Sequence, residues 1–244
     1  MILSQLAANK GKRKGFIWLI DPDKYNGSQI ASQSVIATTG RVDLIFTGGS
    51  LVFSPVDSLI TRIKSLTDIP VVLFPGSPLQ LSNLADGILL LSLISGRNPD
   101  YLIGNHVISA PFLRESGVEI IPTGYLLVDG GRETSVSYIS NSRPIPADKP
   151  DIAVATALAG EMLGLKVIYM DAGSGALNRI SPAMIEAVAS VISVPLIIGG
   201  GLRNPSDVRD AYAAGADAVV VGNAAEEESF SLEKMVAERD RFNI

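Results

Sequence analysis

Two glycine-rich segments near the C-terminal end of the chain could bind an anion. Residues 199–204 read GGGLRN and residues 221–224 read VGNA, and each segment follows a short apolar run. Glycine has no Cβ, so the main chain can approach a phosphate closely and present its N–H groups. The alternative is that these glycines only form tight turns. The positions of both segments favour a phosphate site, and the residues expected there are Gly200, Gly201, Gly222 and Asn223.

Asp21 and Ser50 form a second candidate pair. Each follows one of the first two apolar runs. A carboxylate and a hydroxyl suit Mg²⁺, which takes oxygen ligands and keeps several waters while it contacts substrate phosphates. The alternative is that Asp21 and Asp23 cap the first loop, and that Ser50 caps a helix beginning near Leu51. The spacing alone leaves both interpretations open.

Residues 169–175, which read YMDAGSG, supply a third group. Because side chains alternate along a strand, Tyr169 and Asp171 point to the same side. Asp171 could orient or deprotonate a substrate hydroxyl, while Tyr169 and Ser174 hydrogen-bond the same small polyol. The alternative is that Asp171 only accepts hydrogen bonds from amides of its glycine-rich loop. The segment holds backbone donors and no competing cations, which favours the functional interpretation.

The composition excludes several kinds of chemistry. The chain has 244 residues, 20 Lys and Arg, 25 Asp and Glu, a net charge of −5, one His and no Cys. The absence of Cys excludes thiolate zinc sites, iron–sulfur clusters and disulfides. The acidic balance argues against nucleic acid as a partner. No apolar stretch approaches the roughly 20 residues of a membrane span. We therefore expect a soluble, cytoplasmic protein, and we expect the single His106 to pack in a helix.

The elements that must position these residues alternate between apolar runs and helical patterns. Eight runs are expected to form strands: 16–20, 42–46, 70–74, 87–91, 118–121, 166–170, 194–198 and 218–221. Most are apolar on both faces, as in a parallel sheet covered by helices. Eight such units predict an α/β fold of the (β/α)8 TIM barrel type, whose active sites lie at the carboxyl ends of the strands. The candidate residues follow these runs, apart from Tyr169, which lies within the run 166–170.

The chain is expected to form a single domain over residues 1–244. An irregular excursion around residues 124–150 contains Gly130, Gly131 and three prolines, and it is longer than a usual connection. Neither side of the excursion has enough strands for a sheet of its own. Residues 204–207, which read NPSD, predict a helix start with a capping Asn, a first-turn Pro and an acid at the third helical position.

Five segments in order resemble the geranylgeranylglyceryl phosphate synthase and heptaprenylglyceryl phosphate synthase family, from the first predicted strand to the last. They are 21–24 (DPDK), 47–50 (TGGS), 169–175 (YMDAGSG), 199–203 (GGGLR) and 221–224 (VGNA). The resemblance implies a prenyltransferase that joins a long-chain prenyl diphosphate, most often geranylgeranyl diphosphate, to the 3-hydroxyl of sn-glycerol 1-phosphate. An ether forms and diphosphate is released. The resemblance also implies Mg²⁺ as cofactor, with Asp21 and Ser50 as its ligands.

The resemblance further implies roles for single residues. Asp171 matches the acidic position that faces the glycerol hydroxyl and is expected to be the catalytic base. The family usually carries Glu there, so a bridging water is an alternative to direct proton transfer by the shorter Asp. The substrate-binding residues implied are Tyr169, Met170, Asp171, Ala172, Gly173, Ser174, Gly175, Gly200, Gly201, Gly222 and Asn223. Family membership also implies a homo-oligomer, dimer or hexamer, with transient contact to a membrane surface.

Two other functions are compatible with the residues. One is a different phosphate-binding TIM-barrel enzyme, such as a sugar-phosphate isomerase or lyase. The other is a non-catalytic phosphate-binding barrel, in which Asp21, Ser50 and Asp171 are dispensable. The isomerase or lyase needs no long apolar groove and usually no metal site for a diphosphate.

Overall fold

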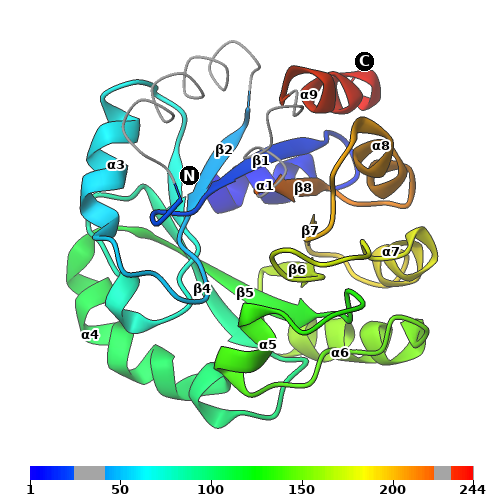
Figure 1. The fold of residues 1–244 in the computed structure, drawn as a ribbon, viewed down its shortest axis with the longest axis horizontal. Helices are drawn as coiled ribbons and strands as arrows, with labels where there is room; N and C mark the ends of the chain where they lie inside the picture. Colours follow the sequence, from blue (N-terminus) through cyan, green and yellow to red (C-terminus); the bar gives the residue numbers. More distant parts are fainter. Residues whose placement is uncertain (25–41, 223–231, 244) are drawn as a thin grey trace.

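Eight parallel strands close into a barrel in the computed structural model, which describes residues 1–24, 42–222 and 232–243 (Figure 1). Each strand pairs with the next along the chain, and the last pairs with the first. The strands are β1 (Gly15–Ile20), β2 (Leu44–Thr47), β3 (Val71–Leu73), β4 (Gly87–Leu93), β5 (Glu119–Leu127), β6 (Val167–Asp171), β7 (Leu196–Gly199) and β8 (Ala218–Val221). The predicted (β/α)8 barrel is therefore confirmed.

Helices surround the barrel wall (Figure 1). They are α3 (Val56–Lys64), α4 (Asn105–Ser116), α6 (Pro150–Met162), α7 (Pro182–Ala189), α8 (Pro205–Ala213) and α9 (Leu232–Phe242). Helix α1 (Ile2–Asn9) packs its apolar side chains against the barrel interior. Short helices η1 (Pro78–Gln80), η2 (Asp100–Gly104) and α5 (Ser135–Ser140) lie in the loops after β3, β4 and β5.

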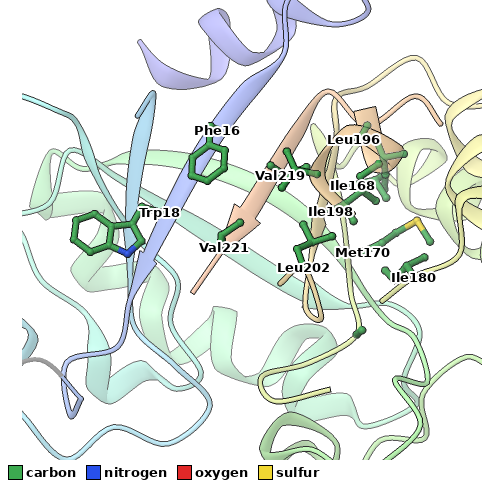
Figure 2. Close-up of a cluster of buried hydrophobic side chains, with 14 of the residues drawn as sticks. Phe16, Trp18, Ile168, Met170, Ile180, Leu196, Ile198, Leu202, Val219 and Val221 are labelled. Carbon is green, nitrogen blue, oxygen red and sulfur yellow. The ribbon is translucent and has the colours of Figure 1, made fainter. Parts of the chain in front are cut away.

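The strand side chains divide into two buried layers. Phe16 and Trp18 of β1 belong to the layer that includes Val219 and Val221 of β8 and the helices outside (Figure 2). Ile17 of β1 belongs to the layer inside the barrel. Alternate residues of a strand point to opposite faces, so an apolar run with no polar alternation fills both layers. This burial explains why the strands were recognisable from sequence.

The helix start predicted at residues 204–207 is confirmed. Asn204 Oδ1 accepts the amide of Asp207 at 3.0 Å, and Asp207 Oδ2 accepts the amide of Asn204 at 3.2 Å. Pro205 is the first helical residue, where its missing N–H costs nothing. This reciprocal cap fixes the point at which the chain leaves the glycine-rich loop after β7 and enters α8.

Strand β5 is longer than the sequence predicts. Its run ends at Ile121 in the sequence pattern because Pro122 and Gly124 read as strand-breaking residues, but the strand continues to Leu127. Gly124 allows the Ile94 side chain to pack closely against β5, since a Cβ on Gly124 would lie 2.9 Å from Ile94 Cδ1. The first residues of the predicted excursion are therefore strand, and the rest contains α5 and a bridge between Val128 and Ile145.

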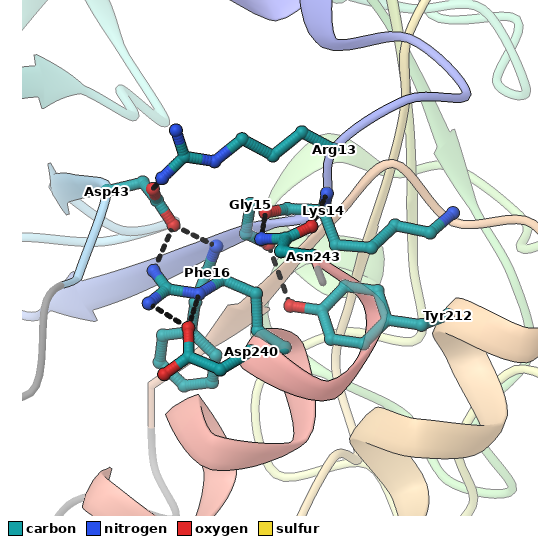
Figure 3. Close-up of polar contacts among 9 residues, drawn as sticks. Arg13, Lys14, Gly15, Phe16, Asp43, Tyr212, Asp240 and Asn243 are labelled. Carbon is teal, nitrogen blue, oxygen red and sulfur yellow. Dashed lines mark hydrogen bonds and ion pairs between the residues drawn. The ribbon is translucent and has the colours of Figure 1, made fainter.

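An ion pair between a buried arginine and the partly exposed Asp43 links α9 to the start of β1 (Figure 3). Arg239 Nη1 lies 2.6 Å from Asp43 Oδ2, and the Arg239 side chain is 2% exposed. The same Asp43 oxygen accepts the amide of Phe16 at 2.8 Å. Lys14 and Asn243 exchange two further hydrogen bonds. The C-terminal helix is thus attached to the first strand, close to where β8 and β1 close the barrel.

Replacing Arg239 with Leu removes the guanidinium and keeps apolar volume. We expect the free energy of unfolding to fall by about 2–4 kcal/mol, because Asp43 loses its buried partner and α9 its anchor. Urea unfolding followed by circular dichroism measures this change. Arg209→Leu is the control, since Arg209 is exposed on α8 and lies 4.0 Å from Asp210. Equal losses in the two variants would contradict the role given to Arg239.

Candidate active site

A cavity of ≈ 750 Å³ opens at the carboxyl ends of the strands. Ten of the predicted site residues line it: Asp21, Ser50, Tyr169, Asp171, Gly173, Ser174, Gly175, Gly200, Gly201 and Gly222. Met170 and Ala172 do not, because their side chains are buried in the layer between barrel and helices. Asn223 lies outside the described residues. The fold therefore brings together, in one cavity, residues that are far apart in sequence.

Asp171 is a buried carboxylate held by two donors. Tyr125 Oη donates to Asp171 Oδ2 at 2.6 Å, and the amide of Gly173 donates to Oδ1 at 2.8 Å. Burial raises the pKa of Asp171 above its ordinary value, while these two hydrogen bonds act in the opposite direction. The amide bond from its own loop, considered above as an alternative role, therefore exists. It leaves the carboxylate at the cavity wall, where it can accept a proton.

Two stacked tyrosines form the wall beside this carboxylate. Tyr125 and Tyr169 are register partners on β5 and β6, and their rings stack with centroids 5.4 Å apart. Burial, followed by the charge of Asp171, raises the pKa of both phenols well above the ordinary value, so both stay protonated. Tyr125 was not among the predicted site residues. Finding Tyr125 requires the register between β5 and β6, which sets it opposite Tyr169.

Gly200 brings the loop after β7 against the loop after β6. Its φ is +74°, a left-handed conformation that other residues rarely adopt. A Cβ on Gly200 would lie 2.5 Å from Asp171 Oδ1 and 2.7 Å from the amide nitrogen of Gly173. Only glycine fits between these groups. The close approach places the glycine-rich backbone next to the buried carboxylate.

The amides of the glycine-rich loops are available to a ligand. Within the described residues, the amides of Gly175, Gly200 and Gly201 donate no hydrogen bond to another protein group. In contrast, the N-terminal amides of α8 are used by its own cap. Cavity-lining amides without an internal partner are suited to phosphate oxygens, as the sequence indicated.

Asp21 and Ser50 line the same cavity at the ends of β1 and β2. Asp21 Oδ1 accepts the amide of Asp23 at 3.1 Å, and its Oδ2 lies 3.6 Å from Lys24 Nζ. The helix once considered at Leu51 does not form, since α3 begins at Val56, so Ser50 is not its cap. A partly exposed carboxylate and a hydroxyl at a cavity suit Mg²⁺ that also takes substrate oxygens.

Asp23 and Gln80 support the loop that carries Ser50. Asp23 accepts the amides of Phe53 at 2.9 Å and Ser54 at 2.7 Å, so it holds the loop after β2 and does not cap its own loop, where Asp21 accepts the Asp23 amide. A hydrogen bond from the Ser54 side chain, followed by the Phe53 amide, lowers the pKa of Asp23. The buried Gln80 donates to the carbonyl of Gly49 at 2.8 Å. Gln80 was not among the predicted site residues, because η1 comes next to the loop after β2 only in the folded chain.

The remaining wall of the cavity is apolar. It is formed by residues from the loop after β3 and from β4, η2 and α5: Phe74, Leu89, Leu91, Leu93, Tyr101 and Val136. His106 on α4 also lines it and shares a hydrogen bond with Ser92 Oγ at 3.1 Å. Burial lowers the pKa of His106, so the ring is neutral near pH 7. The predicted helical position of His106 is confirmed, and its place at the cavity was not foreseen.

Two features are absent from the residues that the structure describes. Among these residues, no group of three or more His, Cys, Asp or Glu side chains is arranged to hold a metal ion. A cation at Asp21 and Ser50 would therefore need oxygens from substrate or water to complete its coordination. In the same part of the chain, no helix has the length and apolar character needed to cross a bilayer.

Known proteins resemble the chain in sequence. The sequence pattern of the PcrB family matches residues 9–239. A geranylgeranylglyceryl phosphate synthase of Chitinophaga pinensis is 56% identical over 223 residues, covering 91% of this chain and 88% of the relative. A protein of the same name from Spirosoma linguale is 49% identical over 232 residues, covering 95% and 93%.

A solved structure resembles the chain in fold. It is the crystal structure of (S)-3-O-geranylgeranylglyceryl phosphate synthase from Thermoplasma acidophilum in complex with the substrate sn-glycerol-1-phosphate. The TM-score is 0.93 at 30% sequence identity, with 99% of each chain covered. The likeness therefore extends over the whole barrel.

Replacing Gly200 with Ala is expected to abolish measurable binding of inorganic phosphate, because the new Cβ collides with the Asp171 carboxylate and distorts the loop. Isothermal titration calorimetry measures the binding. Gly117→Ala is a matched control, since Gly117 has nearly the same φ, +71°, with nothing within 4 Å of its Cβ position. Both variants carry about 1–2 kcal/mol of backbone strain, and phosphate binding should be kept only by the control. Unchanged binding in Gly200→Ala would contradict the site.

Proposed function

The chain belongs to the PcrB family, and on this premise we propose that it transfers the geranylgeranyl group of its diphosphate to the 3-hydroxyl of sn-glycerol 1-phosphate. The reaction forms an ether and releases diphosphate. One observation carries the proposal. Amides suited to a phosphate, a buried carboxylate, a carboxylate–hydroxyl pair and an apolar wall all line a single cavity.

The glycerol phosphate binds at the glycine-rich loops after β6, β7 and β8. The amides of Gly175, Gly200 and Gly201 hold the phosphate, with Gly222 beside them on the cavity wall. Ser174 and Tyr169 orient the glycerol hydroxyls. Support comes from the contact of Gly200 with Asp171, because an ester bound at these amides carries its hydroxyls next to the carboxylate. Asn223, outside the described residues, stays a prediction.

Asp171 is the general base. It accepts the proton of the glycerol 3-hydroxyl, directly or through one water, as that oxygen attacks the allylic carbon of the prenyl group. The bond between this carbon and the diphosphate oxygen breaks, and its electron pair leaves with the diphosphate. Burial supports this role, because it raises the pKa of Asp171 and so makes the carboxylate a stronger base than an exposed one. Tyr125 and the Gly173 amide keep it oriented.

Asp21 and Ser50 are the residues that would hold Mg²⁺ at the diphosphate end of the cavity. When bound, the cation stabilises the negative charge that develops on the leaving group. The pair fits this role chemically, since both side chains supply oxygen donors at the cavity. Lys24 lies beside Asp21 and adds a positive charge at the same place. The apolar wall formed by Phe74 after β3 and by residues of β4, η2 and α5 receives the prenyl tail.

The apolar wall disfavours the other candidate functions. A sugar-phosphate isomerase or lyase, or a barrel that only binds phosphate, has no use for a wall of six large apolar or aromatic side chains beside its phosphate loops. Such a surface exposed in a cavity is costly unless a ligand covers it. Geranylgeranyl, with its apolar tail, is a ligand of this kind.

The homo-oligomer, the transient membrane contact and the cytoplasmic location implied by the resemblance stay predictions. Exposed apolar side chains on η2 and α4, namely Ile103, Val107, Ile108 and Phe112, support the expectation that this face is covered by a second copy or a lipid surface.

The proposed function is tested by incubating the purified protein with Mg²⁺, sn-glycerol 1-phosphate and geranylgeranyl diphosphate. We expect an ether product and one diphosphate released for each product formed, measured by mass spectrometry and a diphosphate assay. Farnesyl and heptaprenyl diphosphates in parallel reactions give the preferred tail length. If no tail length gives ether or diphosphate, the proposed function is wrong, and turnover of a sugar phosphate would favour the isomerase or lyase.

Asp21→Asn should lower kcat/KM by on the order of 10²-fold and raise the Mg²⁺ concentration needed for half-maximal rate, because a neutral amide binds the cation poorly. Chelation with EDTA should abolish turnover of the wild type. Asp57→Asn, on the exposed face of α3, is the control and should behave as wild type. An unchanged Mg²⁺ dependence in Asp21→Asn would refute the metal assignment.

Tyr125→Phe tests the pKa of Asp171. A hydrogen bond to the charged carboxylate lowers its pKa, so removing the Tyr125 hydroxyl leaves burial unopposed and raises that pKa. The base acts only when deprotonated, so the acid limb of kcat/KM against pH should move to higher pH. Tyr138→Phe, exposed on α5, is the control. A limb that stays in place or moves to lower pH would exclude Asp171 as the titrating base.

A further inference from the structure

One charged residue of the cavity has no part in the roles given above. Within the described residues, the lysines and arginines that line the cavity are Lys24 and Arg203. Lys24 lies beside Asp21 in the loop after β1, where the diphosphate is proposed to bind. Arg203 lies in the loop after β7, close in sequence to the amides of Gly200 and Gly201. It is therefore the cation at the glycerol-phosphate end of the described cavity.

Two hydrogen bonds fix the position of Arg203. Its amide donates to Asp207 Oδ2 at 2.9 Å, as part of the cap of α8. Its Nη2 donates to the main-chain carbonyl of Ala176 at 2.6 Å, across to the loop after β6. The guanidinium thus spans the two loops that are proposed to hold the glycerol phosphate. A guanidinium has five N–H donors, so most of its donors are left for a ligand.

The nearby carboxylates are committed to another arginine. Arg179 Nε lies 3.1 Å from Asp207 Oδ1, and its Nη2 lies 2.8 Å from Asp210 Oδ2. The Arg203 side chain makes no ion pair with any described carboxylate. An arginine that is ion-paired has its charge balanced inside the protein, as Arg179 has. Within the described residues, the positive charge of Arg203 at the cavity therefore has no carboxylate partner.

A phosphate monoester is the ligand whose charge this arrangement matches. Near neutral pH it carries more than one negative charge, and backbone amides offer only partial positive charges. An arginine adds full charge and charge-assisted hydrogen bonds, often two to one phosphate. Because the chain is net acidic, local cations of this kind decide whether such an anion is attracted.

We propose that Arg203 is a further substrate-binding residue, which holds the carbonyl of Ala176 with one N–H and offers its charge and remaining donors to the phosphate of the small polyol ester. The identification of that ester as glycerol phosphate rests on the proposed function. The charge and the loop contact belong to the same side chain, so ligand affinity and the position of the 173–176 loop are linked.

Arg203→Gln and Arg203→Lys separate the charge from the hydrogen bond. Gln keeps a donor for Ala176 and loses the charge, whereas Lys keeps the charge. We expect Arg203→Gln to weaken the Kd of sn-glycerol 1-phosphate, measured by calorimetry without prenyl diphosphate, by about tenfold or more. Arg203→Lys should recover part of the affinity. Added KCl should weaken wild-type binding more than binding by Arg203→Gln, since salt screens a charge that the variant lacks.

Arg209→Gln is the matched control, because Arg209 is exposed on α8 and does not line the cavity. It should bind as wild type, and circular dichroism should show all variants folded. Wild-type affinity in Arg203→Gln would overturn the proposal. Equal losses in Arg203→Gln and Arg203→Lys would also overturn it, since the side chain would then only position the loop. If the wild type binds the ester but forms no ether, the proposed function is wrong. The binding measurements on the variants still test the role of Arg203 in that case.

Discussion

The contact between Gly200 and the Asp171 carboxylate is the constraint on which the rest of the site depends. β6 and β7 are neighbours in the barrel, so their ends reach the cavity side by side. Only a residue without Cβ lets the two loops meet there, because a Cβ on Gly200 would lie 2.5 Å from Asp171 Oδ1. A small phosphate ester can therefore touch the amides with its phosphate and the carboxylate with its hydroxyl at the same time.

Burying that carboxylate has a cost that the neighbouring strands offset. A buried charge without partners is unfavourable, and burial alone would favour the neutral acid. The Tyr125 hydroxyl and the Gly173 amide each donate to the carboxylate, which favours the charged form that a base needs. The stacked pair Tyr125 and Tyr169 belongs to the inner barrel layer, and Tyr125 also supports the base proposed at Asp171. On that proposal, the same side chains serve both packing and proton transfer.

The sequence predicted the features that are local in the chain. Strands buried on both faces are apolar throughout, and the polar and glycine residues that follow them mark the carboxyl ends, so the barrel and Asp21, Ser50, Asp171 and Gly200 were found. Tyr125 and Gln80 were missed. Tyr125 reaches Asp171 only through the register of β5 and β6, and the strand was thought to end before it. Gln80 reaches Gly49 only when the loops after β2 and β3 pack together.

The two halves of the cavity therefore differ in how the sequence encodes them. The phosphate half is built from short loops, so a few consecutive residues determine its chemistry. The apolar half combines Leu93 of β4, Tyr101 of η2 and Val136 of α5, whose separation depends on where α4 and α5 sit against the barrel. A substitution beneath either helix would change the room for a prenyl tail without touching a phosphate contact. Tail length can thus vary among chains that keep every motif, which is why the motifs alone do not give it.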